Sequence, residues 1–185
     1  MAGEKVILIL GDSLSAGYGI DVQKSWTALL QRRLAESGYP HRVENASISG
    51  DTTSGGLARL PALLKRHRPV MVVIELGAND GLRGIPIAEA ERNFQRMLEL
   101  ILAMKAKTML LEMRVPPNYG PRYAQQFENL YARLGIIENV HLVPFFLHDV
   151  VLDQSLMQND GLHPNVNAQP KMLKNVWKYL NDELE

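Results

Sequence analysis

The sequence predicts one α/β domain in which helices cover both faces of a parallel β-sheet. Short, mainly apolar segments alternate along the chain with longer segments whose apolar residues recur at helical spacing. Strands that are apolar throughout are typical of parallel sheets, which need a crossover helix between successive strands. A length of 185 residues suits a single domain over residues 1–185, and no repeat, low-complexity stretch or linker divides the sequence.

The first part of the chain is expected to contain a strand, a helix, a second strand and a second helix. Residues 6–10 are apolar throughout, as in a strand that is buried on both faces. Residues 26–34 place apolar side chains on one helical face after Ser25, a favoured N-cap residue. Residues 42–47 are a weaker strand candidate, and residues 57–64 form a helical pattern that its internal proline is expected to interrupt or kink.

The same alternation continues to the end of the chain. Further strands are expected at residues 70–76, 108–113 and 140–143, and further helices at residues 87–101, 122–134 and 173–184. The longest of these helices follows Pro86, because proline suits the start of a helix. The last strand is expected to stop at Pro144, since proline cannot donate to a sheet.

Composition excludes several classes of function. A formal net charge of zero does not suggest nucleic-acid binding, which favours a basic surface. The absence of cysteine excludes disulfides, thiolate metal sites and a cysteine nucleophile. No apolar run approaches the roughly 18 residues of a membrane span. The run at residues 6–10 is too short for a signal-peptide core, so the chain is expected to be either cytoplasmic or the mature form of an exported protein.

Small polar residues and glycines follow the predicted strands. Ser13 comes after the first strand, Gly50 after the second, Asn79 after the third and His163 after the last. The carboxyl ends of parallel strands share one edge of the sheet, and open α/β sheets bind ligands at that edge. The sequence therefore predicts a polar site built from loops that lie far apart along the chain.

A serine nucleophile at this edge would need a histidine base that a carboxylate orients. Of the five histidines, His148 and His163 lie on the predicted edge. His163 is favoured because Asp160 precedes it by three residues and a glycine between them permits a short turn. The adjacent pair His148–Asp149 is the alternative.

Attack on an acyl carbon creates an oxyanion, which needs donors that are already aimed at it. The backbone N–H groups of Ser13 and Gly50 and the side-chain amide of Asn79 are the candidate donors. Gly50 has no side chain to block a substrate. The chemistry expected at this edge is therefore acyl transfer.

Four ordered motifs resemble those of the SGNH, or GDSL, hydrolases. They are GDSL at residues 11–14, ISGD at 48–51, GAND at 77–80 and DGLHP at 160–164. Longer stretches are similar to the bacterial multifunctional thioesterase, lysophospholipase and arylesterase subgroup, namely residues 45–61, 75–84 and 117–123. The resemblance covers essentially the whole chain. One departure is Ala78, where a glycine would be expected.

The resemblance implies a flavodoxin-like, three-layer α/β/α sandwich around a five-stranded parallel sheet. It implies a triad of Ser13, His163 and Asp160, with Ser13, Gly50 and Asn79 lining the oxyanion hole. That chemistry needs neither a metal nor an organic cofactor. The expected partner is a small-molecule acyl ester or thioester, bound by a monomer that engages no nucleic acid and does not insert stably into a membrane. The resemblance also implies a periplasmic location.

Two other functions stay open at the level of the sequence. A carbohydrate acetylesterase would use the same scaffold, and a flavodoxin-like binding module would use the fold without catalysis. The sequence lacks a Walker-type phosphate loop with its lysine, which disfavours nucleoside triphosphates as ligands. Glu75 is unusual inside an apolar strand, and it is expected to contact a polar partner near the site because an unpaired buried charge is costly.

Overall fold

The computed structural model describes residues 5–184, which form a five-stranded parallel sheet with strand order β2-β1-β3-β4-β5. The strands are β1 (Lys5–Gly11), β2 (His41–Asn45), β3 (Met71–Glu75), β4 (Lys107–Leu111) and β5 (Val140–Val143). The strand order reverses direction between β1 and β3. Ligands of such sheets bind at this switch point, beyond the carboxyl ends of the two strands.

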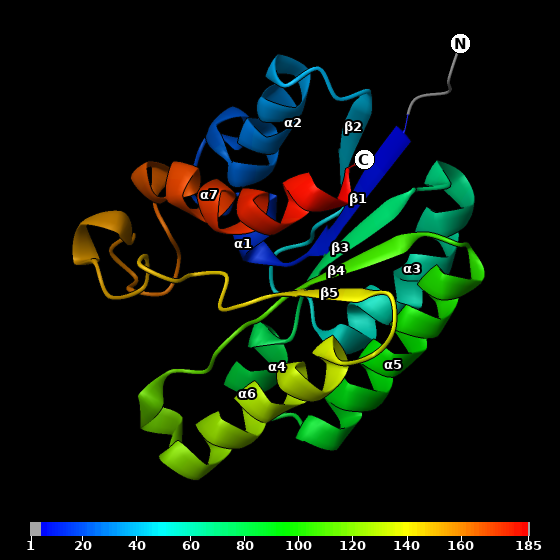
Figure 1. Cartoon of the computed structure of the whole chain (residues 1–185). Helices are drawn as coiled ribbons and strands as arrows, with labels where there is room; N and C mark the ends of the chain where they lie inside the picture. The colour runs from blue at the N-terminus through cyan, green and yellow to red at the C-terminus, as the bar shows by residue number, and fades with distance from the viewer. Residues whose placement is uncertain (1–4, 185) are drawn as a thin grey trace.

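Helices cover both faces of the sheet, which gives the predicted three layers (Figure 1). One face carries α2 (Trp26–Glu36) and α7 (Gln169–Leu180), and the other carries α3 (Thr53–His67), α5 (Ile87–Ala103) and α6 (Pro121–Gly135). Two short helices, α1 (Ser13–Ala16) and α4 (Ala78–Leu82), directly follow β1 and β3. Short 3-10 helices are η1 (Val22–Lys24), η2 (Pro117–Tyr119), η3 (Gln154–Leu156), η4 (Val166–Ala168) and η5 (Asn181–Glu183).

The expected interruption at Pro61 is wrong, because α3 runs through this residue without a break. Proline inside a helix removes one hydrogen bond at a cost of about 3 kcal/mol. Leu60 and Leu64 of the same helix are buried, and burying a leucine contributes about 1.5–3 kcal/mol. The apolar face of α3 therefore outweighs the lost bond. The predicted start of α2 is confirmed, since the Ser25 hydroxyl accepts a hydrogen bond from the N–H of Ala28.

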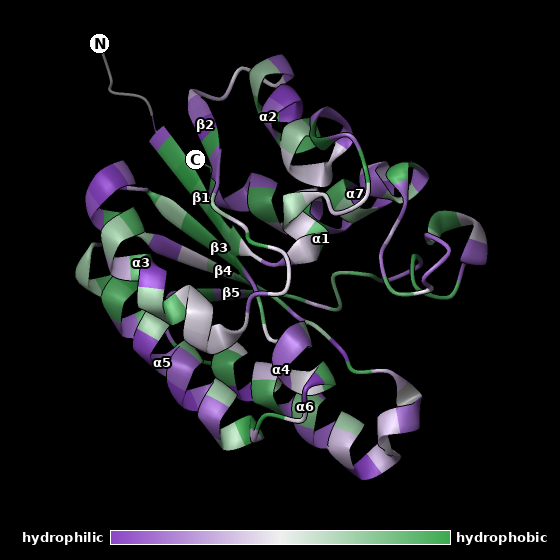
Figure 2. Ribbon diagram, turned by 180° about the vertical axis from the view of Figure 1, so that it is seen from behind, coloured by the Kyte–Doolittle hydropathy of each residue, from purple (hydrophilic) through white to green (hydrophobic). Residues whose placement is uncertain are grey.

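The core lies between the sheet and its helices. β3 is buried along its whole length, as expected for a strand that helices cover on both sides. Trp26 of α2 is fully buried, and its ring lies edge-on to Phe146 with 5.4 Å between the centroids. Figure 2 shows this partition, with apolar residues along the strands and hydrophilic residues on the outward faces of the helices. Within residues 5–184, no helix is long and apolar enough to cross a membrane.

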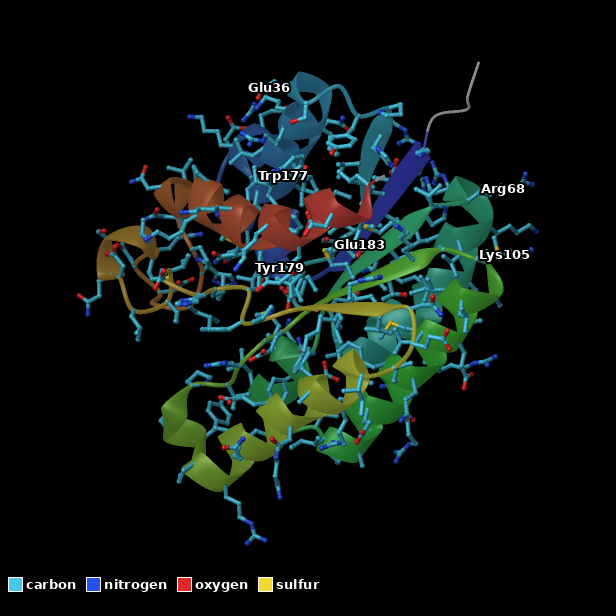
Figure 3. All side chains as sticks on the ribbon, viewed as in Figure 1. Glu36, Arg68, Lys105, Trp177, Tyr179 and Glu183 are labelled. Carbon is cyan, nitrogen blue, oxygen red and sulfur yellow. The ribbon has the colours of Figure 1, made fainter. Side chains whose placement is uncertain are left out.

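The two edges of the sheet differ in character. At the amino edge, turns at Arg68 and Lys105 lead into β3 and β4, and both residues lie at the outside of the molecule (Figure 3). At the carboxyl edge lie α1, α4 and the long segment 144–168 after β5. The candidate site residues all belong to the carboxyl edge, as predicted.

Candidate active site

Ser13 stands at the sharp turn between β1 and α1. The carboxylate of Asp12 caps α1 by accepting the backbone N–H of Leu14 at 3.0 Å. The N–H of Ser13 itself donates to no group in the described chain, as is usual for the first residue of a helix. The turn therefore presents a hydroxyl and a free backbone donor from the same residue.

His163 and Asp160 reach Ser13 from the long loop after β5. His163 Nε2 lies 3.0 Å from Ser13 Oγ, and His163 Nδ1 lies 2.7 Å from Asp160 Oδ2. The other carboxylate oxygen of Asp160 accepts the backbone N–H groups of Leu162 and His163, both at 2.9 Å. Gly161, with a φ of +65°, permits this tight turn. The three side chains form a continuous hydrogen-bonded line from the serine to the carboxylate.

The hydrogen bonds to Asp160 keep its carboxylate ionised. The backbone N–H and the imidazole of His163, together with the backbone N–H of Leu162, lower the pKa of Asp160 from 3.8 to about 2. A carboxylate beside Nδ1 favours the tautomer in which Nδ1 carries the proton. Nε2 is then free to accept the proton of the Ser13 hydroxyl.

Tyr18 and Gln158, which the sequence did not single out, support His163. The ring of Tyr18 lies against the imidazole, with 4.5 Å between the centroids and 39° between the planes. The side-chain amide of Gln158 donates to the backbone carbonyls of Tyr18 at 2.8 Å and Pro164 at 3.1 Å. Gln158 thus joins the histidine loop to the segment that follows Ser13. Neither residue belongs to a motif or a periodic pattern, so the fold alone reveals their contacts.

Gly50 is the second predicted oxyanion donor. Its φ of +80° lies in the region that glycine adopts most readily. Within residues 5–184, its N–H makes no hydrogen bond. Its carbonyl accepts a hydrogen bond from the guanidinium of Arg83 at 2.7 Å. Because Arg83 is the C-cap residue of α4, it ties the Gly50 loop to the helix that carries Asn79.

Asn79 lies in the first turn of α4, and its side-chain amide is already hydrogen-bonded. Nδ2 donates to Asp12 Oδ2 and to the Asp51 carbonyl, both at 2.9 Å. An amide nitrogen carries two hydrogens, so both are engaged. The expectation of a ready donor is therefore refined, because one hydrogen must change partner before it can bind an oxyanion. Gly77 begins this turn at a φ of +104°, and a Cβ there would clash with the hydroxyl of Tyr131.

All five predicted residues lie at the carboxyl edge. Ser13, His163 and Asp160 are linked directly by hydrogen bonds. Asn79 connects the Ser13 turn, through Asp12, to the Gly50 loop, through the Asp51 carbonyl. The structure thus joins four segments of the chain into one network.

The alternative pair of His148 and Asp149 does not reach Ser13. Their Nδ1 and Oδ1 atoms lie 3.1 Å apart, but the two side chains are 71% and 73% exposed. His141 of β5 pairs instead with Glu183 at 3.0 Å, near the end of the chain (Figure 3). The geometry therefore favours His163 as the base. Among the described residues, no group of three or more histidine, aspartate and glutamate side chains is placed to hold a metal ion.

A serine, an imidazole and a carboxylate in one hydrogen-bonded line, with free backbone donors nearby, are the features of a serine hydrolase. A model of the GDSL-like lipase/acylhydrolase family matches residues 9–169. The chain belongs to this family and is a serine ester hydrolase.

Similar proteins extend this identification over nearly the whole chain. Esterase TesA of Pseudomonas aeruginosa is 52% identical over 179 residues, which cover 97% of this chain and 89% of that protein. Thioesterase 1/protease 1/lysophospholipase L1 of Escherichia coli is 47% identical over 169 residues, which cover 91% of this chain and 80% of that protein. The crystal structure of the psychrotrophic esterase EstA from Pseudoalteromonas sp., inhibited by monoethylphosphonate, superposes with a TM-score of 0.93 at 43% identity, covering 97% of this chain and 98% of that one.

Proposed function

We propose that this protein hydrolyses carboxylic ester and thioester bonds of acyl substrates through an acyl-enzyme on Ser13. The observation that carries the proposal is the line from Ser13 Oγ through His163 to Asp160, with contacts of 3.0 and 2.7 Å. This line lets the imidazole take the hydroxyl proton in the step in which Oγ attacks the acyl carbon.

The reaction has two halves. In the first, Ser13 Oγ bonds to the acyl carbon and His163 Nε2 takes its proton, which then passes to the leaving alcohol or thiol as the C–O or C–S bond breaks. In the second, His163 takes a proton from water, whose oxygen attacks the acyl-enzyme, and returns that proton to Ser13 as the acid departs. Asp160 stays ionised and stabilises the positive imidazolium in both halves.

The oxyanion is held by the free N–H groups of Ser13 and Gly50 and by the amide of Asn79. Of the two acceptors that now engage this amide, the carboxylate of Asp12 is stronger than the carbonyl of Asp51, because charge-assisted hydrogen bonds are roughly twice as strong as neutral ones. The hydrogen on the Asp51 carbonyl is therefore the one that the oxyanion shares or takes over, while the hydrogen bond to Asp12 fixes the plane of the amide.

Acyl thioesters, aryl esters and lysophospholipids are the proposed substrates. One source of support is the similarity to proteins named esterase TesA and thioesterase 1/protease 1/lysophospholipase L1. A second is the set of exposed apolar side chains next to the site residues, namely Tyr18, Ile48 and Leu162. Exposed apolar side chains beside a few polar groups suit an acyl chain whose carbonyl is held at the catalytic serine.

Rates across a matched series of p-nitrophenyl esters and acyl thioesters test this substrate range. We expect kcat/KM to rise as the acyl chain lengthens beyond acetyl, and we expect both leaving groups to be accepted. The chief alternative, a carbohydrate acetylesterase, would prefer acetyl esters and reject longer chains. That preference would contradict the proposed range.

Removing the Asn79 side chain tests the oxyanion assignment. We expect Asn79→Ala to lower kcat by about a hundred- to a thousand-fold, because one oxyanion donor is lost while the serine and its base remain. Steady-state kinetics with an aryl ester measure the effect. Asn129→Ala is the matched control, since Asn129 lies exposed on α6. Full activity of Asn79→Ala would show that the donor is assigned wrongly.

The monomeric state and the periplasmic location stay predictions. Light scattering of the purified protein measures its mass in solution, and fractionation of the native host locates the enzyme. A stable dimer or a cytoplasmic pool would contradict the respective expectation.

A further inference from the structure

Glu75 is a buried residue whose carboxyl group contacts the turn between β1 and α1 that carries Ser13. It ends β3, its backbone pairs in register with Gly11 at the end of β1, and its side chain is 0% exposed. Its Oε2 accepts the hydroxyl of Ser15 at 2.8 Å and the backbone N–H of Asp12 at 3.2 Å. Its Oε1 has no hydrogen-bond partner in the described chain. The mechanism derived above gives this side chain no task.

The surroundings of Glu75 favour a neutral carboxylic acid. No lysine, arginine or histidine of residues 5–184 forms an ion pair with it. The nearby Asp12 is a second buried carboxyl, 1% exposed. Burial first, and then the charge of Asp12, raise the pKa of Glu75 well above its ordinary value. Two buried negative charges side by side would be costly, so Glu75 holds a proton at neutral pH.

Asp12 is the member of the pair that carries charge. Burial raises its pKa to about 6, against the hydrogen bonds that it accepts, so it is largely ionised at neutral pH. It receives hydrogen bonds from the Leu14 N–H and the Asn79 amide at 3.0 and 2.9 Å. These bonds link the cap of α1 to the proposed oxyanion donor.

The backbone of Gly11 makes room for the glutamate. A Cβ on Gly11 would lie 2.8 Å from Glu75 Oε2 and 2.8 Å from the Cβ of Ser15. Ser15 also accepts a hydrogen bond from the indole N–H of the fully buried Trp26 at 3.2 Å. The glutamate therefore lies between the rigid core on one side and the Ser13 turn on the other.

We propose that Glu75 is a positioning residue, a neutral buried carboxylic acid that holds the Ser13 turn in place from the side of the core. Through Asp12, it also orients the side-chain amide of Asn79. Its Oε2 accepts hydrogen bonds from the backbone N–H of Asp12, one residue before Ser13, and from the hydroxyl of Ser15, two residues after it. Its neutrality matters because a second negative charge near the oxyanion would oppose the charge that the site must stabilise. This inference rests on the proposed roles of Ser13 and Asn79.

Two substitutions separate this role from simple packing. Glu75→Gln keeps the size and a carbonyl acceptor for Asp12 and Ser15 without any charge. Glu75→Met keeps a similar volume but offers no comparable acceptor. We expect Glu75→Gln to lower kcat by less than about threefold. We expect Glu75→Met to lower kcat by about ten- to a hundred-fold with KM little changed, because in this variant two buried donors lose their acceptor. Thr108→Val is the matched control, since Thr108 is a buried polar residue at the amino end of β4.

Titration of active sites with a fluorophosphonate normalises kcat to the folded, active fraction. Equal kcat in Glu75→Met and the wild type would reduce Glu75 to a packing residue and overturn the proposal. An equal loss of kcat in Glu75→Gln and Glu75→Met would overturn the proposal that Glu75 acts as a neutral acid.

An infrared difference spectrum tests the protonation of Glu75 without relying on activity. The spectrum of the wild type minus Glu75→Gln at neutral pH is expected to contain the C=O stretching band of a protonated carboxylic acid. A carboxylate band in its place would overturn the neutral acid even if Glu75→Met does not fold. Failure of the wild type to label at Ser13 would instead refute the proposed function, and the infrared result would stand apart from it.

Discussion

Ser13→Ala is expected to abolish covalent labelling by a fluorophosphonate and to lower ester hydrolysis by about 10⁴- to 10⁶-fold. The substitution removes the single oxygen that can bond to the acyl carbon. It leaves His163 and Asp160 in place, because the contacts between them do not involve the serine. The remaining activity would come from the oxyanion donors, which still stabilise the oxyanion that forms when water attacks the ester directly. Mass spectrometry of labelled protein and steady-state kinetics measure the two effects.

Ser37→Ala is the matched control for this substitution. Ser37 is the exposed C-cap residue of α2, and the described structure gives its side chain no part in the site. It should label and turn over like the wild type. Labelling at another serine in Ser13→Ala would refute the central assignment, because the fold presents no second serine to His163 within the described residues.

The motif residues of the site could be predicted because each follows the end of a strand. Apolar runs locate the strands, the parallel arrangement brings their carboxyl ends together, and this places Ser13, Asn79 and His163 at one edge. The uninterrupted helix at Pro61 could not be predicted, because local rules include the hydrogen bond that proline removes but not the tertiary burial of Leu60 and Leu64. Local rules describe the chain well where tertiary packing agrees with them.

The contacts that hold the site residues in position could not be predicted, for a different reason. Tyr18 and Gln158 act through contacts between loops, and their spacing in the sequence carries no signal. The sequence predicts the amide of Asn79 as an oxyanion donor, but it gives no sign that the carboxylate of Asp12 and the carbonyl of Asp51 occupy both of its hydrogens. Glu75 was visible as an anomaly in an apolar strand, yet its partners Asp12 and Ser15 emerge only when β1 and β3 pair.

Asp160→Asn is expected to lower kcat by about 10³- to 10⁴-fold while KM changes little. The asparagine carbonyl can still accept the backbone N–H groups of Leu162 and His163, so the loop keeps its shape. The amide nitrogen, however, replaces the oxygen that faces His163 Nδ1 at 2.7 Å. An N–H at this position favours the tautomer with the proton on Nε2, which cannot accept the proton of Ser13.

Asp153→Asn is the matched control, because Asp153 also accepts a backbone N–H two residues ahead, from Ser155 at 3.0 Å, but faces no histidine. It should retain wild-type kinetics, so a loss confined to Asp160→Asn reflects the tautomer of His163 rather than the shape of the loop.

The depressed pKa of Asp160 adds a second test, because its carboxylate stays charged until the pH falls toward about 2. Orientation of the imidazole is then present above the ordinary pKa of an aspartate and is lost only as the pH falls through that low value. An acid limb of kcat/KM in the wild type near pH 4 would therefore belong to another group, and full turnover by Asp160→Asn would show that the carboxylate holds the loop without orienting the base.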